Sequence, residues 1–249
     1  MLHSIKSLYG KRLGASDDKV GHVEDCYFDD ENWAVRYFAA DTDWWNPPRR
    51  VLLSPHAFGP IPNHGKTLPV RLTREQIEKS PTLDLRGPVS REFETNYYRY
   101  YDWPFYWEGG CLWGPSDAPT RKSSLNQAPQ RQTTNQPGNG DRQPDAPHTP
   151  IRSARAAFGL PVYSGANAIG RVADFLMDEK DWRIRYLALD IGHWYSRKEI
   201  LISTRKILSI DWERSRVDAT PTREEIERAV LRPRPRHFVA ASEPGVPVS

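Results

Sequence analysis

The chain has 249 residues, which is enough for two domains of ordinary size. Hydrophobic residues make up 38% of it, a low share for one compact globule, so we expect part of the chain to lie outside any core. The 35 basic and 32 acidic residues nearly cancel, and no dense basic run occurs, so a nucleic-acid partner is not expected. No stretch approaches the ~18 apolar residues of a membrane helix, and the N-terminus lacks the apolar run of a secretory signal. We therefore expect a cytoplasmic protein without a membrane span.

A single gapless offset of 149 residues aligns two parts of the chain with each other. Four blocks of the first part match four blocks of the second: residues 21–25 (GHVED) with 170–174 (GRVAD), 33–41 (WAVRYFAAD) with 182–190 (WRIRYLALD), 51–54 (VLLS) with 200–203 (ILIS), and 73–78 (TREQIE) with 222–227 (TREEIE). Chance does not keep four blocks in one register, so the chain contains a duplicated module. Two copies are too few for a solenoid, and each copy must therefore carry its own core.

Apolar residues alternate along residues 33–41 and again along 182–190, which predicts a β-strand in each copy. A period of two places Tyr37 on the inward face and turns Arg36 outward, and Arg185 is expected to face outward in the second copy. Acidic stretches join neighbouring blocks and favour turns through local hydrogen bonds to the backbone. Short strands with closely spaced turns predict a small barrel in each copy.

Each copy is predicted to end in a short helix. Thr73 with Gln76, and Thr222 with Glu225, have the spacing of a capping box, in which an N-cap hydroxyl and a side chain three residues later satisfy the first backbone amides. Ile77 is expected to anchor the first of these helices on its barrel. Cys26 lies in a strand-like run and is expected to be a small buried hydrophobe.

Residues 86–150 between the copies hold two different stretches. Residues 97–114, here called the aromatic segment, are crowded with Tyr, Trp and Phe, whereas residues 115–150 are polar and proline-rich and predict a flexible linker. Tyr and Trp dominate interface hot spots, so the aromatic segment is a candidate interaction motif. The candidate protein-binding side chains are Tyr97, Tyr98, Tyr100, Tyr101, Trp103, Phe105, Tyr106, Trp107 and Trp113. The favoured alternative is a lid over one barrel that fills the groove between the two, because so many exposed aromatics would aggregate; both hold if a partner displaces the lid.

The sequence shows no set of residues with the spacing typical of a catalytic, metal-binding or cofactor-binding site. None of the seven histidines has the spacing of a helical metal pair, and neither a Gly-x-Ser-x-Gly elbow nor a glycine-rich phosphate loop occurs. The best carboxylate candidates are Asp41 and Asp190, beside Trp45 and Trp194. Because both copies carry this pair, we interpret it as part of the architecture of the module. The chain is predicted not to be an enzyme and to use no cofactor or metal.

At the level of these blocks the chain resembles the PRC-barrel domain family. Residues 8–81 match nearly every element of the family pattern, and residues 157–231 match slightly fewer, since Ile191 and Thr204 replace the usual Thr and Pro. The resemblance implies a small β-barrel module of the kind found in the cytoplasmic part of the photosynthetic reaction-centre H subunit and at the C-terminus of a ribosome-maturation factor. What these relatives share is contact with other proteins. The residues expected to hold the module together are Gly21, Asp25, Trp33, Arg36, Tyr37, Asp41 and Trp45 in the first copy, and Gly170, Asp174, Trp182, Arg185, Tyr186, Asp190 and Trp194 in the second.

We therefore expect a mainly β chain of two small PRC-type β-barrels, each with a short terminal helix, joined by an aromatic segment and a disordered linker. The expected parts are a first barrel at 1–85, the aromatic segment and flexible linker at 86–150, a second barrel at 151–232 and a flexible tail at 233–249. The predicted function is that of a non-enzymatic scaffold or adaptor that binds a protein. Its barrels would pair within the chain or between two chains as a homodimer. The alternatives are a component like the H subunit, supporting a membrane photosynthetic electron-transfer complex, and an assembly factor associated with the ribosome or RNA.

Overall fold

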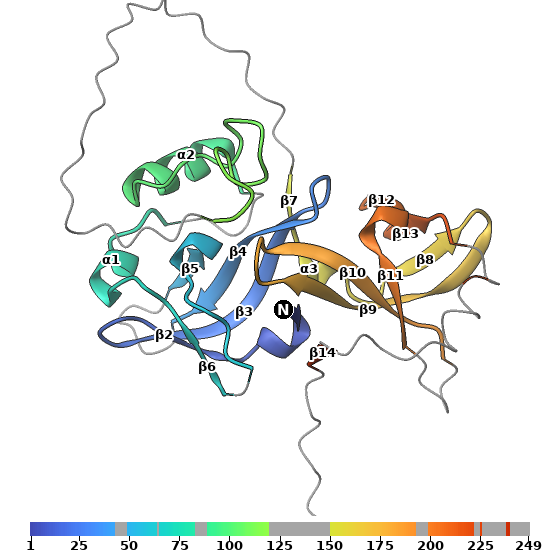
Figure 1. Cartoon of the computed structure of the whole chain (residues 1–249), viewed down its shortest axis with the longest axis horizontal. Helices are drawn as coiled ribbons and strands as arrows, with labels where there is room; N and C mark the ends of the chain where they lie inside the picture. Colours follow the sequence, from blue (N-terminus) through green and yellow to red (C-terminus); the bar gives the residue numbers. More distant parts are fainter. Residues whose placement is uncertain are drawn as a thin grey trace, which may run out of the picture.

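The computed structural model describes residues 1–42, 49–63, 65–82, 89–119, 150–192, 199–221, 225 and 238–239. The described strands form one curled sheet of 14 strands that runs through both copies (Figure 1). This confirms the expected mainly β fold. Most of the expected linker, of the second terminal helix and of the tail lies outside the described residues, as do Trp45 and Trp194.

The first copy is built around the long antiparallel hairpin β3–β4, whose other neighbours are short strands. β5 continues the sheet beside β4, and β2 lies beside β3 and pairs in parallel with β6. The elements are β1 (Leu2–Ser4), η1 (Lys6–Leu8), β2 (Arg12–Gly14), β3 (Lys19–Asp29), β4 (Ala34–Asp41), β5 (Arg50–Leu53), η2 (Pro55–Ala57), β6 (Thr67–Pro69) and α1 (Arg74–Glu78).

The second copy repeats the order of strands β2 to β6 and adds one further strand beside the last of them. β8, β9, β10, β11 and β13 take the places of β2 to β6, and the residue pairing carries over at the same offset: Leu13 faces Leu68 as Val162 faces Val217. The elements are β7 (Ile151–Ser153), α3 (Ala154–Ala157), β8 (Pro161–Ser164), β9 (Asn167–Asp178), β10 (Arg183–Asp190), β11 (Glu199–Ser203), η3 (Thr204–Lys206), β12 (Ile207–Asp211) and β13 (Arg216–Ala219), with β14 (Phe238–Val239) pairing beside β1.

The two copies exchange their first strands. β1 precedes the first copy in sequence but pairs with β9 of the second, and β7 pairs in the equivalent register with β3 of the first. The exchanged strands β1 and β7 are here called the arms. Each arm is held by a hydrogen bond to a buried or half-buried carboxylate: the Ser153 hydroxyl donates to Asp25 over 2.6 Å, and the Ser4 hydroxyl donates to Asp174. Asp25 and Asp174, expected to hold one module together, thus also join each module to the arm of the other.

A pair of backbone hydrogen bonds connects the two hairpins at the centre of the molecule. The Ile184 amide donates to the Trp33 carbonyl over 2.7 Å, and the Val35 amide donates to the Trp182 carbonyl over 2.9 Å. Each bond becomes the other when 149 is added or subtracted, so a pseudo-twofold axis passes between them. This contact merges the two curled halves into one sheet, the blue and orange halves of Figure 1.

Glycine is required where β3 and β9 approach the ends of their hairpin partners. Gly21 and Gly170 both have a φ of 155°, in the region that side chains rarely adopt. A Cβ on Gly21 would lie 1.8 Å from the carbonyl oxygen of Asp41, and one on Gly170 would lie 2.8 Å from that of Asp190. The predicted structural role of these glycines therefore has a steric cause.

The first terminal helix has the predicted cap. The Thr73 hydroxyl accepts from the Gln76 amide, and the Gln76 side chain accepts from the Thr73 amide, which confirms the capping box. Ile77 and Cys26 are fully buried, as expected. Among the described residues, no helix has the length and apolar character needed to cross a membrane.

Candidate interaction site

Residues 90–118 fold over the first module and are here called the cover. Helix α2 (Arg91–Tyr100), capped by the Ser90 hydroxyl, lies above β4 and β5, and the chain then loops back beside it (Figure 1). Of the candidate aromatic residues, Tyr97, Tyr98, Tyr106 and Trp113 are buried, Tyr101, Trp103, Phe105 and Trp107 are partly buried, and Tyr100 is exposed. Their rings form one continuous cluster against the barrel rather than a free surface.

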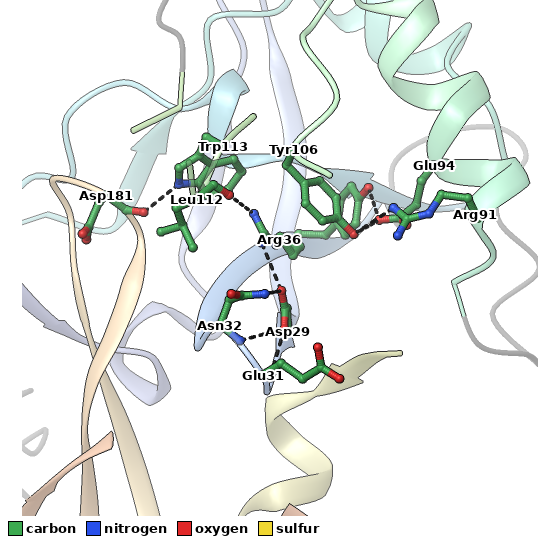
Figure 2. A network of polar contacts seen from close by, with 11 residues as sticks. Asp29, Glu31, Asn32, Arg36, Arg91, Glu94, Tyr106, Leu112, Trp113 and Asp181 are labelled. Atoms are coloured by element: carbon green, nitrogen blue, oxygen red, sulfur yellow. Dashed lines mark hydrogen bonds and ion pairs between the residues drawn. The ribbon is translucent and has the colours of Figure 1, made fainter. Parts of the chain in front are cut away.

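Arg36 lies at the centre of the contact between the barrel and the cover (Figure 2). Its side chain is 2% exposed; one terminal nitrogen lies 3.0 Å from the Asp29 carboxylate, and the other donates to the Leu112 carbonyl over 2.8 Å. The guanidinium carbon lies 3.8 Å from the ring centre of Tyr106 and 5.0 Å from that of Trp113. A planar cation can satisfy a carboxylate, a carbonyl and two aromatic faces at once, which offsets the cost of its burial.

The expectation that Arg36 turns outward into solvent is therefore wrong. The ladder between β3 and β4 shifts register here, since Tyr37 faces Tyr27 whereas Val35 faces Phe28. Arg36 is the extra residue of this β-bulge, and the simple alternation of faces fails at a bulge. As a result Arg36 and Tyr37 both contact the cover.

A buried carboxylate fastens α2 to the strand beneath it. Glu94 is fully buried and accepts hydrogen bonds from the Tyr37 hydroxyl (2.9 Å), the Tyr106 hydroxyl (2.8 Å) and Arg91 (3.1 Å). Burial raises the pKa of Tyr37 and Tyr106, and the nearby charge of Glu94 raises both further. Both phenols therefore stay protonated and act as donors at neutral pH.

The cover also completes the outer edge of β5. The Tyr97 hydroxyl accepts from the Ser54 amide over 3.0 Å and donates to the Leu52 carbonyl over 2.9 Å. An edge strand presents such backbone groups in a row, and here one phenol satisfies two of them. The Tyr98 hydroxyl lies 3.4 Å from the Ser54 hydroxyl.

Trp103 and Trp113 of the cover both pack on His56 of the first module, and Trp113 also makes a contact with the second module. The ring of Trp103 stacks on His56 at 5.2 Å, and the ring of Trp113 meets His56 edge-on at 5.3 Å. The indole nitrogen of Trp113 donates to the Asp181 carbonyl over 2.8 Å. The cover therefore packs on one module and makes a hydrogen bond to the turn of the other.

Comparison with known protein families assigns a family to the second module, whose strand β7 pairs with β3 of the first module. The model of the PRC-barrel domain matches residues 152–226, the span from β7 to the helical residue Glu225. These residues form a PRC-barrel domain. A search of curated proteins found no match to the chain.

In this PRC-barrel domain the residues equivalent to the site lie differently. Arg185 pairs with Asp181 and Asp178 of its own hairpin and keeps 33% of its side-chain surface exposed, and Tyr186 is half-buried. Asp190 accepts the Gly192 amide over 2.9 Å, a local contact at the start of the loop that follows β10. No part of the described chain covers this face as residues 90–118 cover the first module.

The contact residues that the sequence analysis missed include Asp29, Glu94 and His56. For Glu94 a signal was present: together with Tyr97, Tyr98 and Tyr101 it has the spacing i, i+3, i+4 and i+7 of one helix face. Within the described residues, no three metal-binding side chains gather at one place. The hydroxyls of Tyr37 and Tyr97, the carboxylate of Glu94 and both terminal nitrogens of Arg36 have partners across or beside the contact, an arrangement suited to holding a polypeptide.

Proposed function

We propose that the chain is a non-enzymatic protein-binding scaffold built from two PRC-barrel modules, with residues 1–82 as the first. Support for a second PRC-barrel module comes from the strand order and register that the first copy shares with residues 152–226. The continuous sheet and the exchanged arms join the pair into one platform. Such a platform can present two related faces at a constant distance from each other.

One observation carries this proposal: the outer face of the first module already holds a polypeptide. Arg36 binds a backbone carbonyl of the cover, Tyr37 donates to Glu94, and the β5 edge is completed by Tyr97. Charged hydrogen bonds, aromatic anchors and edge-strand completion are the means by which proteins recognise one another. We therefore interpret the cover as a ligand within the same chain, and its contacts support the proposal that the module binds a polypeptide.

The test is affinity capture with the whole immobilised chain in lysate of the source cell, at physiological salt and after nuclease treatment. We expect stoichiometric capture of a protein, and that protein, tagged in turn, should retrieve the chain. Loss of capture on nuclease treatment would favour the RNA-associated alternative, and capture of a photosynthetic membrane complex would favour the H-subunit-like alternative. If no protein is captured above background, the scaffold proposal is overturned.

A further inference from the structure

The PRC-barrel domain presents a basic cavity of about 490 Å³ beside the central contact between the modules. Three of its side chains are arginines and one is a carboxylate. The cavity is lined by Glu31, Asn32, Trp33, Arg183, Arg185, Tyr186, Ser203, Thr204 and Arg205. It opens on the face of the second module that no described part of the chain covers.

This cavity is the pseudo-symmetric counterpart of the place where the cover sits. Subtracting 149 from Arg185, Tyr186, Ser203 and Arg205 gives Arg36, Tyr37, Ser54 and His56. In the first module all four of those residues contact the cover, through Leu112, Glu94, Tyr97, Trp103 and their neighbours. The residue equivalent to Asn32 is Asp181, whose carbonyl binds Trp113. Five positions that hold the cover thus recur in the lining of the open cavity.

The equivalent surfaces differ in exposure, and among the described residues only the first surface is covered. The Arg36 side chain is 2% exposed and that of Arg185 is 33% exposed. Among the described strands, β11 pairs only with β10, and Ile202 faces Leu187 as Leu53 faces Phe38. By this register the backbone of β11 presents the same outer edge that Tyr97 completes on β5.

The residues that differ between equivalent positions of the two surfaces indicate the charge of a ligand that would bind the second one. Arg183 stands where the first module has Ala34, and Arg205 stands where it has His56. A guanidinium can stack on an aromatic ring as the imidazole of His56 does, and it also binds a carboxylate. At two further lining positions Glu31 stands where the first surface has Lys180, and Asn32 where it has Asp181. The second surface therefore keeps the aromatic chemistry of the first, gains two guanidinium groups and has a net charge that is more positive by one.

We propose that this cavity docks an aromatic, acidic polypeptide segment of a partner protein, held as the first module holds its cover. The proposal rests on the scaffold function and names the binding face. The cover of the same chain cannot supply the occupant, because Tyr97, Tyr98 and Trp113 are buried against the first module. A second copy of the chain has its cover engaged in the same way, so the segment comes from a different protein.

The test uses a fluorescent synthetic peptide with the sequence of residues 90–114, titrated with the whole chain and followed by anisotropy. We expect saturable one-to-one binding that Arg205→Glu weakens by about tenfold or more, since a charged contact is lost. Arg214→Glu is the matched control: it makes the same charge change in the same domain, its side chain is 73% exposed, and it does not line the cavity. A peptide with Gln at the position of Glu94 should bind more weakly, because the hydroxyl of Tyr186 would lose its carboxylate acceptor.

Two outcomes overturn the docking site: no saturable binding of the peptide, or equal binding by Arg205→Glu and Arg214→Glu. Melting curves of both variants exclude unfolding as the cause of a loss. Affinity capture from lysate, repeated with both variants, distinguishes failure of this docking site from failure of the scaffold function. A partner retained equally by Arg205→Glu and Arg214→Glu leaves the scaffold function intact and removes this face from it, whereas a partner lost only with Arg205→Glu supports both.

Discussion

At the residue scale, the buried ion pair of Arg36 and Asp29 holds the cover and the first hairpin together. Asp29 accepts the amides of Glu31 and Asn32 as well as the guanidinium, so its charge serves the turn and the cover at once. Removing one partner of a buried pair leaves the other charge desolvated, which is far more costly than losing an exposed pair. The two copies allow this difference to be measured within one chain.

We expect Arg36→Ala to lower the free energy of unfolding by about 3–5 kcal/mol, because it leaves Asp29 and the Leu112 carbonyl buried without their donor. The matched variant Arg185→Ala removes an arginine at the equivalent position whose side chain is one-third exposed, and should cost at most about 1 kcal/mol. Urea denaturation measures both. Equal losses would contradict the view that the cover buries Arg36 in solution.

Glu94 provides a second test of the cover. The hydroxyls of Tyr37 and Tyr106 both donate to Oε1 of Glu94, whereas Arg91 donates to Oε2. In Glu94→Gln the amide carbonyl can still accept both hydroxyls, but an NH2 group then faces the Arg91 guanidinium and the charge is lost, which should cost about 1–3 kcal/mol in unfolding free energy. Glu92→Gln changes the same group on an exposed position of α2 and should be nearly neutral. Thermal unfolding of the two variants distinguishes them; similar melting temperatures would show that Glu94 is not engaged as described.

His3, on the exchanged strand β1, gives the molecule a pH-dependent contact. Burial lowers the pKa of His3, an effect that the hydrogen bond and charge of Glu179 only partly oppose. The unfolded chain then binds the proton more readily, so the stability due to neutral His3 is complete above a pH of about 6.5 and is lost as the pH falls through the folded pKa. We expect the fall in unfolding free energy between neutral and acidic pH to be smaller in His3→Gln. Identical pH profiles would rule out this role.

At the element scale, the close approach of hairpin strands depends on Gly21. Gly21→Ala should lower the free energy of unfolding by more than about 1 kcal/mol, since the new Cβ meets the Asp41 carbonyl and the backbone has a positive φ. Gly110→Ala is the control, because nothing lies within 4 Å of its Cβ and its φ is not positive. Chemical denaturation of both variants gives the answer; a neutral Gly21→Ala would mean that β3 and β4 relax apart without cost.

At the scale of the whole molecule, the exchange of β1 and β7 makes each module incomplete without the other. In a fragment of residues 150–249 the place of β1 beside β9 is vacant, and the equivalent strand β7 of a second fragment can fill it, with Ser153 reaching Asp174. We therefore expect this fragment to form a symmetric homodimer whose population rises with concentration. Sedimentation equilibrium measures this, with the full chain as control. A fragment that is folded and monomeric throughout would contradict a structural need for the exchanged arm.

The mainly β architecture was predictable from the sequence because it follows from local patterns. Repeated blocks at one offset, alternating strands, acidic turns and a capping box depend on neighbouring residues, and the structure confirms the mainly β fold and the box at Thr73. The role of Asp25 was predictable only in part. Its strand could be recognised, but its contact with Ser153 spans 128 residues and follows from the exchange of arms.

The sequence by itself determined the repeat of four blocks at one offset, the mainly β fold and the aromatic segment between the repeats. Only the tertiary structure decided that Arg36 is buried, that Glu94 holds the cover, and that the described residues cover this face in the first module but not in the second. These features depend on a bulge, on contacts between distant residues and on a pseudo-twofold axis. Apart from the helix-face spacing of Glu94, they leave no local pattern in the chain, because each arises when segments far apart in sequence pack together.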